Sequence, residues 1–171
     1  FEELYSQANQ DKIFDLYEVG KLTSNEFVDY LLQFLPEDTK AEKVISAWNA
    51  MLLDLPKNRI DFLTELKTKL PIYLFSNTND LHYKCFKNEM KAVYGDDQLL
   101  ETTFVHTYFS HLCQVRKPNA EAFELVMKKH GLKAPRTLFI DDSIQHIEGA
   151  KKLGIQAYHL VNEEIQDIIT F

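Results

Sequence analysis

The chain has 171 residues, the size of one domain or of one domain with an inserted subdomain. Its formal net charge of −7 at pH 7 argues against a nucleic-acid partner, which would favour a basic surface. No apolar run approaches the ~20 residues of a membrane-spanning helix. Cys85 and Cys113 stand in no Cys-x-x-Cys or Cys/His metal pattern. We therefore expect a cytoplasmic protein without a membrane segment, carrying two free thiols.

Residues 1–58 are predicted to be helical throughout, because apolar residues recur there with helical spacing and no strand signal appears. One apolar face begins at Phe27, and Pro36 is expected to end that helix. A further helix is predicted around Trp48. The region therefore reads as a small helical bundle.

From Ile60 onward, predicted strands alternate with predicted helices. Short apolar runs that favour strands lie at 71–75, 104–109, 137–140 and 155–160. Helical patterns lie at 60–66, 81–93, 119–130 and 143–153. This alternation predicts a doubly wound, mostly parallel α/β sheet. We expect two domains, the helical bundle at 1–58 and the α/β core at 59–171.

Polar residues follow three of the apolar runs: Ser76-Asn77, Lys117 and Asp141-Asp142. The carboxyl ends of the strands in a parallel sheet face the same crevice. Hydroxyl, amide and helix-start N–H groups can hold phosphate oxygens, and a lysine ammonium can neutralise their charge. Two carboxylates suit Mg²⁺, which binds one or two of them together with waters and substrate phosphate. The sum is a predicted Mg²⁺-phosphate site.

Each of these motifs also has an ordinary structural reading. Ser76-Asn77 can be a turn that caps a helix, and Lys117 can be a solvated surface lysine. Asp141-Asp142 can be a capping pair, although two adjacent carboxylates that are partly buried need a cation or protonation. The order and context of the three motifs favour the functional reading.

The α/β half of the chain resembles the haloacid dehalogenase-like superfamily of phosphohydrolases. The superfamily's second motif is a strand ending in Ser or Thr, as in Leu74-Phe75-Ser76-Asn77. Its third motif is a lysine often followed by proline, as in Val115-Arg116-Lys117-Pro118. Its fourth is a strand ending in two acidic residues, as in Phe139-Ile140-Asp141-Asp142-Ser143. Residues 1–58 are similar to the helical cap that many members insert after their first motif, and the core would be Rossmann-like.

The resemblance implies a role for each of these residues. Ser76 would hydrogen-bond the transferring phosphoryl group, with Asn77 assisting. Lys117 would neutralise the phosphoryl charge and steady the nucleophile. Asp142 would be the direct Mg²⁺ ligand, with Asp141 supporting the metal or Lys117. The superfamily reaction uses an aspartate nucleophile and passes through an aspartyl-phosphate that water hydrolyses.

The superfamily's first motif, an apolar strand followed by that aspartate, is not found in the sequence. The one similar stretch contains Asp15, but its flanks read as helix, which makes Asp15 an exposed helix residue. The first strand lies in the middle of such a sheet. Without it, neighbouring backbone groups would be left unpaired, at about 1–3 kcal/mol each. We therefore expect the nucleophile upstream of Phe1.

Three functions follow from this pattern. The first is Mg²⁺-dependent hydrolysis of a small phosphorylated metabolite. The second is a metal-independent haloacid dehalogenase, against which Asp141-Asp142 argues because that chemistry gains nothing from an acidic pair. The third is a non-catalytic binding protein of the same fold that lacks the nucleophile.

Overall fold

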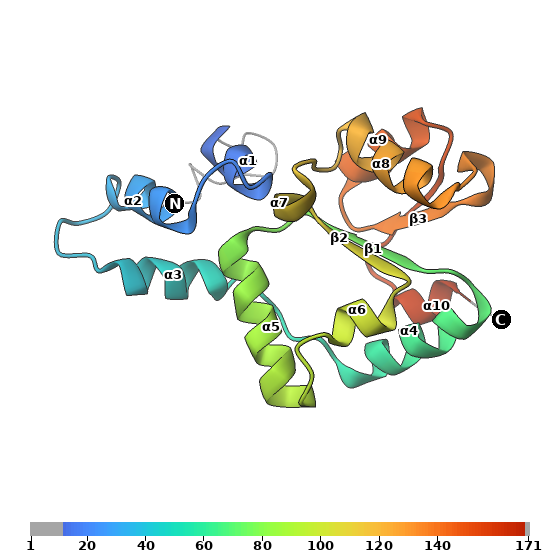
Figure 1. Cartoon of the computed structure of the whole chain (residues 1–171), viewed down its shortest axis with the longest axis horizontal. Coiled ribbons are helices and arrows are strands. Elements are labelled where there is room, and N and C mark those ends of the chain that lie inside the picture. Colours follow the sequence, from blue (N-terminus) through green and yellow to red (C-terminus); the bar gives the residue numbers. More distant parts are fainter. Residues whose placement is uncertain (1–11, 170–171) are drawn as a thin grey trace. The chain divides into compact units, whose positions relative to one another are not determined.

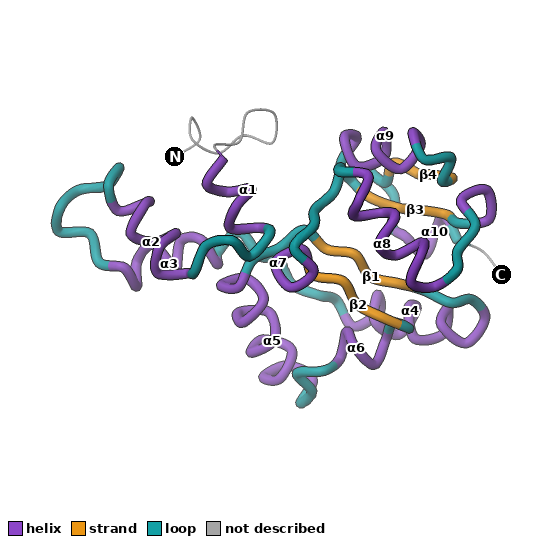
Figure 2. Tube along the Cα trace, turned by 45° about the horizontal axis from the view of Figure 1, so that its top comes forward, coloured by secondary structure: helices purple, strands orange, loops and turns teal. Residues whose placement is uncertain are grey.

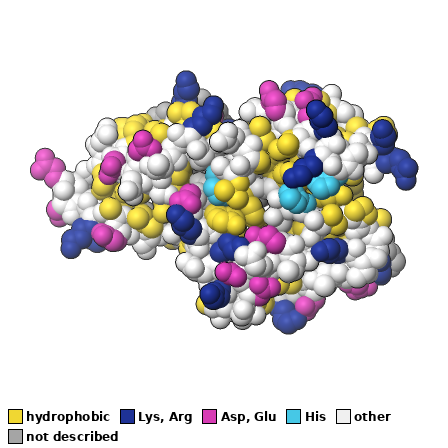
Figure 3. Space-filling view, viewed as in Figure 1, with side chains coloured by type: hydrophobic (Ala, Val, Ile, Leu, Met, Phe, Trp, Pro, Cys, Tyr) yellow, Lys and Arg dark blue, Asp and Glu magenta, His cyan; other side chains and the backbone are white. Residues whose placement is uncertain are grey.

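The computed structural model describes residues 12–169 and divides the chain into two compact units, residues 1–114 and 115–171 (Figure 1). The predicted domain boundary at 58/59 lies inside the first unit and stays a prediction. Among the described residues, no helix is both long and apolar enough to cross a membrane. On the face drawn in Figure 3, acidic and basic side chains are interspersed.

The first unit begins with three short helices that share one apolar core. They are α1 (Lys12–Glu18), α2 (Ser24–Leu32) and α3 (Ala41–Asn49). Phe27 is fully buried and stacks on Tyr17, with ring centroids 4.1 Å apart. Thr23 and Glu26 form a capping box, in which each side chain accepts a hydrogen bond from the other's backbone N–H. The predicted helical bundle is thus present between residues 12 and 49, and we call α1–α3 the bundle. The prediction that 1–58 is helical throughout is wrong at 51–56, and its part at 1–11 lies outside the described residues.

Helix α2 ends at Leu32, earlier than the prediction that Pro36 ends it. The N–H of Phe34 bonds the carbonyl of Leu31 in a tight turn, and a proline disfavours helical geometry in the residue before it. Phe34 consequently lies 52% exposed, outside the bundle core.

The rest of the first unit carries a parallel strand pair (Figure 2). Its elements are α4 (Lys57–Lys69), β1 (Tyr73–Ser76), α5 (Asp80–Tyr94), α6 (Leu99–Thr103), β2 (His106–Phe109) and α7 (Ser110–Cys113). The register places Ser76 opposite Phe109, so the carboxyl ends of both strands lie level. Helix α3 of the bundle packs against α5, the helix that follows β1.

The second unit repeats the pattern of helix and parallel strand. It contains α8 (Ala120–His130), the 3₁₀ helix η1 (Ala134–Arg136), β3 (Leu138–Asp141), α9 (Ile144–Lys152), β4 (Gln156–His159) and α10 (Ile165–Ile168). Strands β3 and β4 pair in parallel, with Asp141 opposite His159. A Cβ on Gly149 would lie 2.7 Å from the carbonyl oxygen of Pro118, so only glycine lets α9 approach the loop after Lys117.

Within the described residues, β1–β2 and β3–β4 form separate two-stranded sheets. Both pairs are parallel, as predicted, and each places a candidate site residue at a strand's carboxyl end. These residues are Ser76 in the first unit and Asp141 in the second.

Candidate active site

The loop after β1 is fixed by the residue that follows β2. The Ser110 hydroxyl accepts a hydrogen bond from the N–H of Thr78 at 2.9 Å and donates one to the carbonyl of Thr78 at 2.9 Å. Ser110 is fully buried and Thr78 is 6% exposed, so these bonds are shielded from water. The parallel register thus ties the end of β1 to the end of β2 and holds Ser76 and Asn77 in place between strand and helix.

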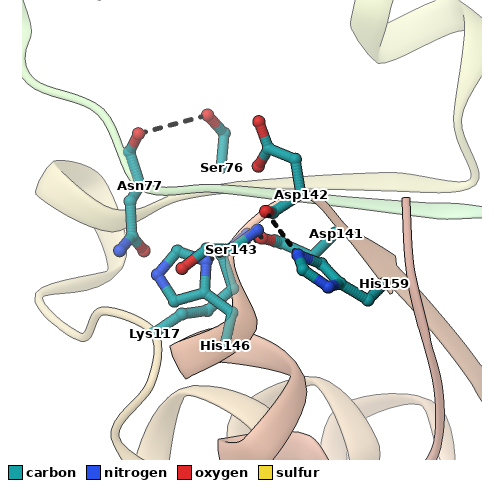
Figure 4. Close-up of polar contacts among 8 residues, drawn as sticks. All are labelled: Ser76, Asn77, Lys117, Asp141, Asp142, Ser143, His146 and His159. Carbon is teal, nitrogen blue, oxygen red and sulfur yellow. Dashed lines mark hydrogen bonds and ion pairs between the residues drawn. The ribbon is translucent and has the colours of Figure 1, made fainter. Parts of the chain in front are cut away.

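The N–H groups at the start of α5 are already engaged. Asn79 is the N-cap, and its Oδ1 accepts from the N–H of His82 at 3.0 Å. The N–H of Leu81 donates to the Tyr17 hydroxyl at 3.1 Å. The expectation that helix-start N–H groups hold phosphate is therefore wrong at these two positions. The two predicted phosphate-binding residues, Ser76 and Asn77, precede this helix start, and the Ser76 hydroxyl lies 3.5 Å from the Asn77 carbonyl (Figure 4).

Lys117 lies in the second unit as half of a buried ion pair. Its Nζ is 2.6 Å from Oδ2 of Asp141, and the two side chains are 7% and 8% exposed. The ammonium also lies 5.4 Å from the ring centroid of Phe139. The reading of Lys117 as a solvated surface lysine is excluded by this burial.

Asp141 accepts hydrogen bonds on both carboxylate oxygens. Oδ1 accepts from the N–H of Ser143 at 2.9 Å and lies 2.9 Å from Nδ1 of His146. Burial alone would raise the pKa of the Asp141 carboxyl. The hydrogen bond with His146 and the charge and hydrogen bond of Lys117 outweigh burial and hold that pKa well below its ordinary value. Asp141 is therefore an anion that keeps the Lys117 ammonium in one position.

Asp142, the next residue, has a different environment. It is exposed, and its side chain points away from Lys117 and His146 (Figure 4). Its backbone carbonyl accepts from Nε2 of His159 at 2.9 Å, which fixes the chain at the end of β3. The described residues of the second unit show no hydrogen bond or ion pair to the Asp142 carboxylate.

The chemistry of this carboxylate fits a magnesium ion. Mg²⁺ binds through one or two carboxylates and keeps several waters, so it needs no cage of protein ligands. The described residues contain no group of three or more His, Cys, Asp and Glu that could form such a cage. An exposed Asp142 beside an engaged Asp141 is thus a donor set suited to Mg²⁺ and unsuited to an ion that needs full protein ligation.

The structure groups the predicted residues in two sets, Ser76 with Asn77 in the first unit and Lys117 with Asp141 and Asp142 in the second. That the two sets share one site stays a prediction. Sequence reasoning did not single out His146, which the structure places beside Asp141. The signal was its place in the first turn of α9, directly behind the acidic pair.

Asp15, the one sequence-based candidate for a nucleophile, lies within helix α1. This confirms its assignment to a helix instead of a strand. Its expected exposure is wrong, because its Oδ1 atom is buried.

Comparison with known proteins places the chain in a family. Residues 6–154 match the model of the haloacid dehalogenase-like hydrolases. D-ribitol-5-phosphate phosphatase from Bacteroides thetaiotaomicron is 28% identical over 161 residues, which cover 90% of this chain and 74% of that protein.

Two solved structures show the same fold. A haloacid dehalogenase family enzyme from B. thetaiotaomicron, an aspartate-to-alanine variant in complex with magnesium and inorganic phosphate, is 31% identical with a TM-score of 0.87, covering 98% of this chain and 82% of that one. A predicted family hydrolase from Porphyromonas gingivalis is 25% identical with a TM-score of 0.82, covering 98% and 80%. These matches confirm the predicted α/β fold class, and the chain belongs to the haloacid dehalogenase-like hydrolases.

Proposed function

We propose that the protein is a Mg²⁺-dependent phosphatase that hydrolyses a small phosphomonoester through an aspartyl-phosphate. The observation that carries the proposal is that the two adjacent aspartates at the end of β3 have different environments. Asp141 is buried and bound to Lys117, whereas Asp142 is exposed and open to a ligand. A haloacid dehalogenase reaction would gain nothing from this second carboxylate.

Lys117 supplies fixed positive charge for the phosphoryl group. Because Asp141 holds the ammonium in a buried position, little reorganisation is needed when phosphate charge arrives. Ser76 and Asn77 would bind phosphoryl oxygens with a hydroxyl and an amide. Mg²⁺ held by Asp142 would neutralise phosphate charge when bound.

The nucleophile stays a sequence-based expectation, an aspartate upstream of Phe1. Asp15 is a poor candidate, because it lies within a helix and its Oδ1 atom is buried in the first unit. A nucleophile must present a carboxylate oxygen to the substrate, and the Oδ1 atom of Asp15 is buried.

The relatives support a phosphorylated small molecule as substrate. One of them is named D-ribitol-5-phosphate phosphatase, and another was solved with magnesium and inorganic phosphate. We therefore propose pentitol and sugar phosphates as the first substrates to test.

The test is phosphate release by the full-length protein from D-ribitol 5-phosphate and related esters, with Mg²⁺ and with EDTA. We expect turnover that needs Mg²⁺ and that falls at least ~100-fold in Asp142→Asn, because the variant loses a carboxylate ligand to the metal. Glu148→Gln is the matched control, a carboxylate on the exposed side of α9, and should keep full activity. Metal-independent halide release, or no turnover of any phosphate ester by the full-length protein, would contradict the proposal.

A further inference from the structure

The bundle is joined to the start of α5 by a closed ring of hydrogen bonds. Asn79 Oδ1 accepts from Nε1 of Trp48 at 3.3 Å as well as from the N–H of His82. Asn79 Nδ2 lies 3.2 Å from Nδ1 of His82, and Nε2 of His82 lies 2.9 Å from the carbonyl of Trp48. A carbonyl can only accept, so Nε2 of His82 carries the proton and Nδ1 accepts from the Asn79 amide.

This ring sits in an apolar environment. Asn79 is 3% exposed and Trp48 is 5% exposed. The indole also stacks on the His82 ring, with centroids 5.1 Å apart and 17° between the planes. Burial of polar groups is tolerated only when they are paired, so the ring holds one arrangement and resists partial breakage.

A second set of bonds runs parallel to the ring. The Tyr17 hydroxyl, which accepts from the N–H of Leu81, lies 2.9 Å from the Ser24 hydroxyl. Ser24 in turn donates to Oδ2 of Asp80 at 2.6 Å. The bundle therefore forms hydrogen bonds with three consecutive residues at the start of α5, from Asn79 to Leu81.

We propose that Asn79 is a positioning residue, through which the bundle sets the Ser76–Asn77 end of β1 for phosphate binding. This inference rests on the proposed function. The loop between Ser76 and Asn79 is short, and Ser110 holds its middle at Thr78. A displacement of Trp48 in the bundle core should therefore also displace Ser76 and Asn77. Phosphate bound at Ser76 conversely changes the surroundings of Trp48.

An ordinary helix cap would not require the bundle. The bond from the His82 N–H to Asn79 Oδ1 caps α5 within the helix itself. The two functions of Asn79 can be separated, because serine also caps helices but is too short to reach Trp48. Asn79→Ser should therefore keep the cap and lose the link.

Trp48 is the single tryptophan of these 171 residues, and the part of the full-length protein's emission that Trp48→Phe removes reports on the link. We would titrate the full-length protein with inorganic phosphate in the presence of Mg²⁺, following Trp48 emission and, separately, the heat of binding. In the wild type the two signals should share one midpoint. In Asn79→Ser the emission change should vanish and the phosphate dissociation constant should rise about tenfold, a fraction of the ~100-fold that misplacement by 1 Å can cost.

Kinetics provide a second readout. Trp48→Phe keeps an aromatic side chain but removes the Nε1–H donor to Asn79. This variant and Asn79→Ser should both lower kcat/KM about tenfold. Val28→Ala is the control, since Val28 lies in the same core without taking part in the ring. It should lower stability and leave kcat/KM unchanged.

The outcomes separate the inference from the proposed function. Phosphate binding seen by calorimetry with no change in Trp48 emission, together with full activity of Asn79→Ser, would overturn the inference alone. Absence of Mg²⁺-dependent turnover of any phosphate ester by the wild type would overturn the proposed function, and the inference with it.

Discussion

The two sets of candidate site residues are held by different forces. In the first unit, the loop after Ser76 is fixed by neutral hydrogen bonds from Ser110 and, through Asn79, from Trp48. In the second unit, Lys117 is fixed by a buried ion pair with Asp141. Removal of one partner from a neutral network leaves an unpaired dipole. Removal of one partner from a buried ion pair leaves an uncompensated charge, which costs more free energy. The second unit should therefore be the more fragile to single substitutions.

The sharpest test of this contrast is Lys117→Met, which removes the charge and keeps a side chain of similar length. We expect a loss of about 3–5 kcal/mol in the free energy of unfolding, because Asp141 keeps its burial without its cation. Urea unfolding followed by circular dichroism measures the loss. Activity should disappear as well, since nothing replaces the ammonium at the site.

Lys57→Met is the control for that experiment. Lys57 pairs with Asp61 at 2.7 Å, but the two side chains are 73% and 60% exposed. Such a surface pair contributes about 0–1 kcal/mol. Equal destabilisation by the two variants would show that the Lys117–Asp141 pair is not buried in solution.

A smaller effect is expected from His146→Leu, which removes one hydrogen bond to Asp141 and leaves Lys117 in place. A bond to a charged group is worth about 1.5–3 kcal/mol, so the loss of stability should fall below that of Lys117→Met. His146→Gln, whose amide can donate to the same oxygen, should recover most of the stability and of kcat. Equal losses in the Leu and Gln variants would rule out a role for the hydrogen bond.

The sequence was sufficient to predict the elements that local rules determine. Alternation of apolar runs and helical patterns predicted parallel strands at 71–75 and 137–140, and the observed strands end one residue later, at Ser76 and Asp141. The sequence motif around Lys117 predicted that this lysine neutralises phosphoryl charge, but it did not predict that the side chain is buried. Burial depends on Phe139 and Asp141, which are distant in the chain and meet Lys117 only once β3 has formed.

The sequence could not show which polar groups form hydrogen bonds with each other and are therefore unavailable to a ligand. The helix start at Leu81 and His82 carries the N–H groups that often bind phosphate, yet a tyrosine 64 residues away in the chain takes one of them. No spacing rule links Tyr17 to Leu81 or Trp48 to Asn79. Such pairings follow from how the bundle packs on α5, so only the folded chain reveals them.

The smallest predicted effect concerns acid and again contrasts the two units. Burial lowers the pKa of His82 and of His111, both in the first unit. An unfolded histidine titrates near ~6.5, so between that pH and the lower folded pKa the unfolded state binds more protons. Stability from these groups is therefore complete above about pH 6.5 and declines as the pH falls below it. Asp141 is charged when deprotonated, and its pKa is lowered in the folded state. Its contribution to folding stability is therefore complete above pH ~3.8 and declines only below that pH.

Mild acid should consequently loosen the first unit before the second. Amide hydrogen exchange at pH 7.5 and pH 5.5, corrected for the intrinsic pH dependence, should show lost protection in α5 and unchanged protection in α9. The loss of protection should be smaller than the losses expected from Lys117→Met and His146→Leu, because His82 and His111 are only half-buried residues. His82→Gln keeps a donor toward the carbonyl of Trp48 and cannot titrate, so it should flatten the pH dependence in α5. If that variant kept the full dependence, His82 would not be the group that couples acid to the link between the bundle and α5.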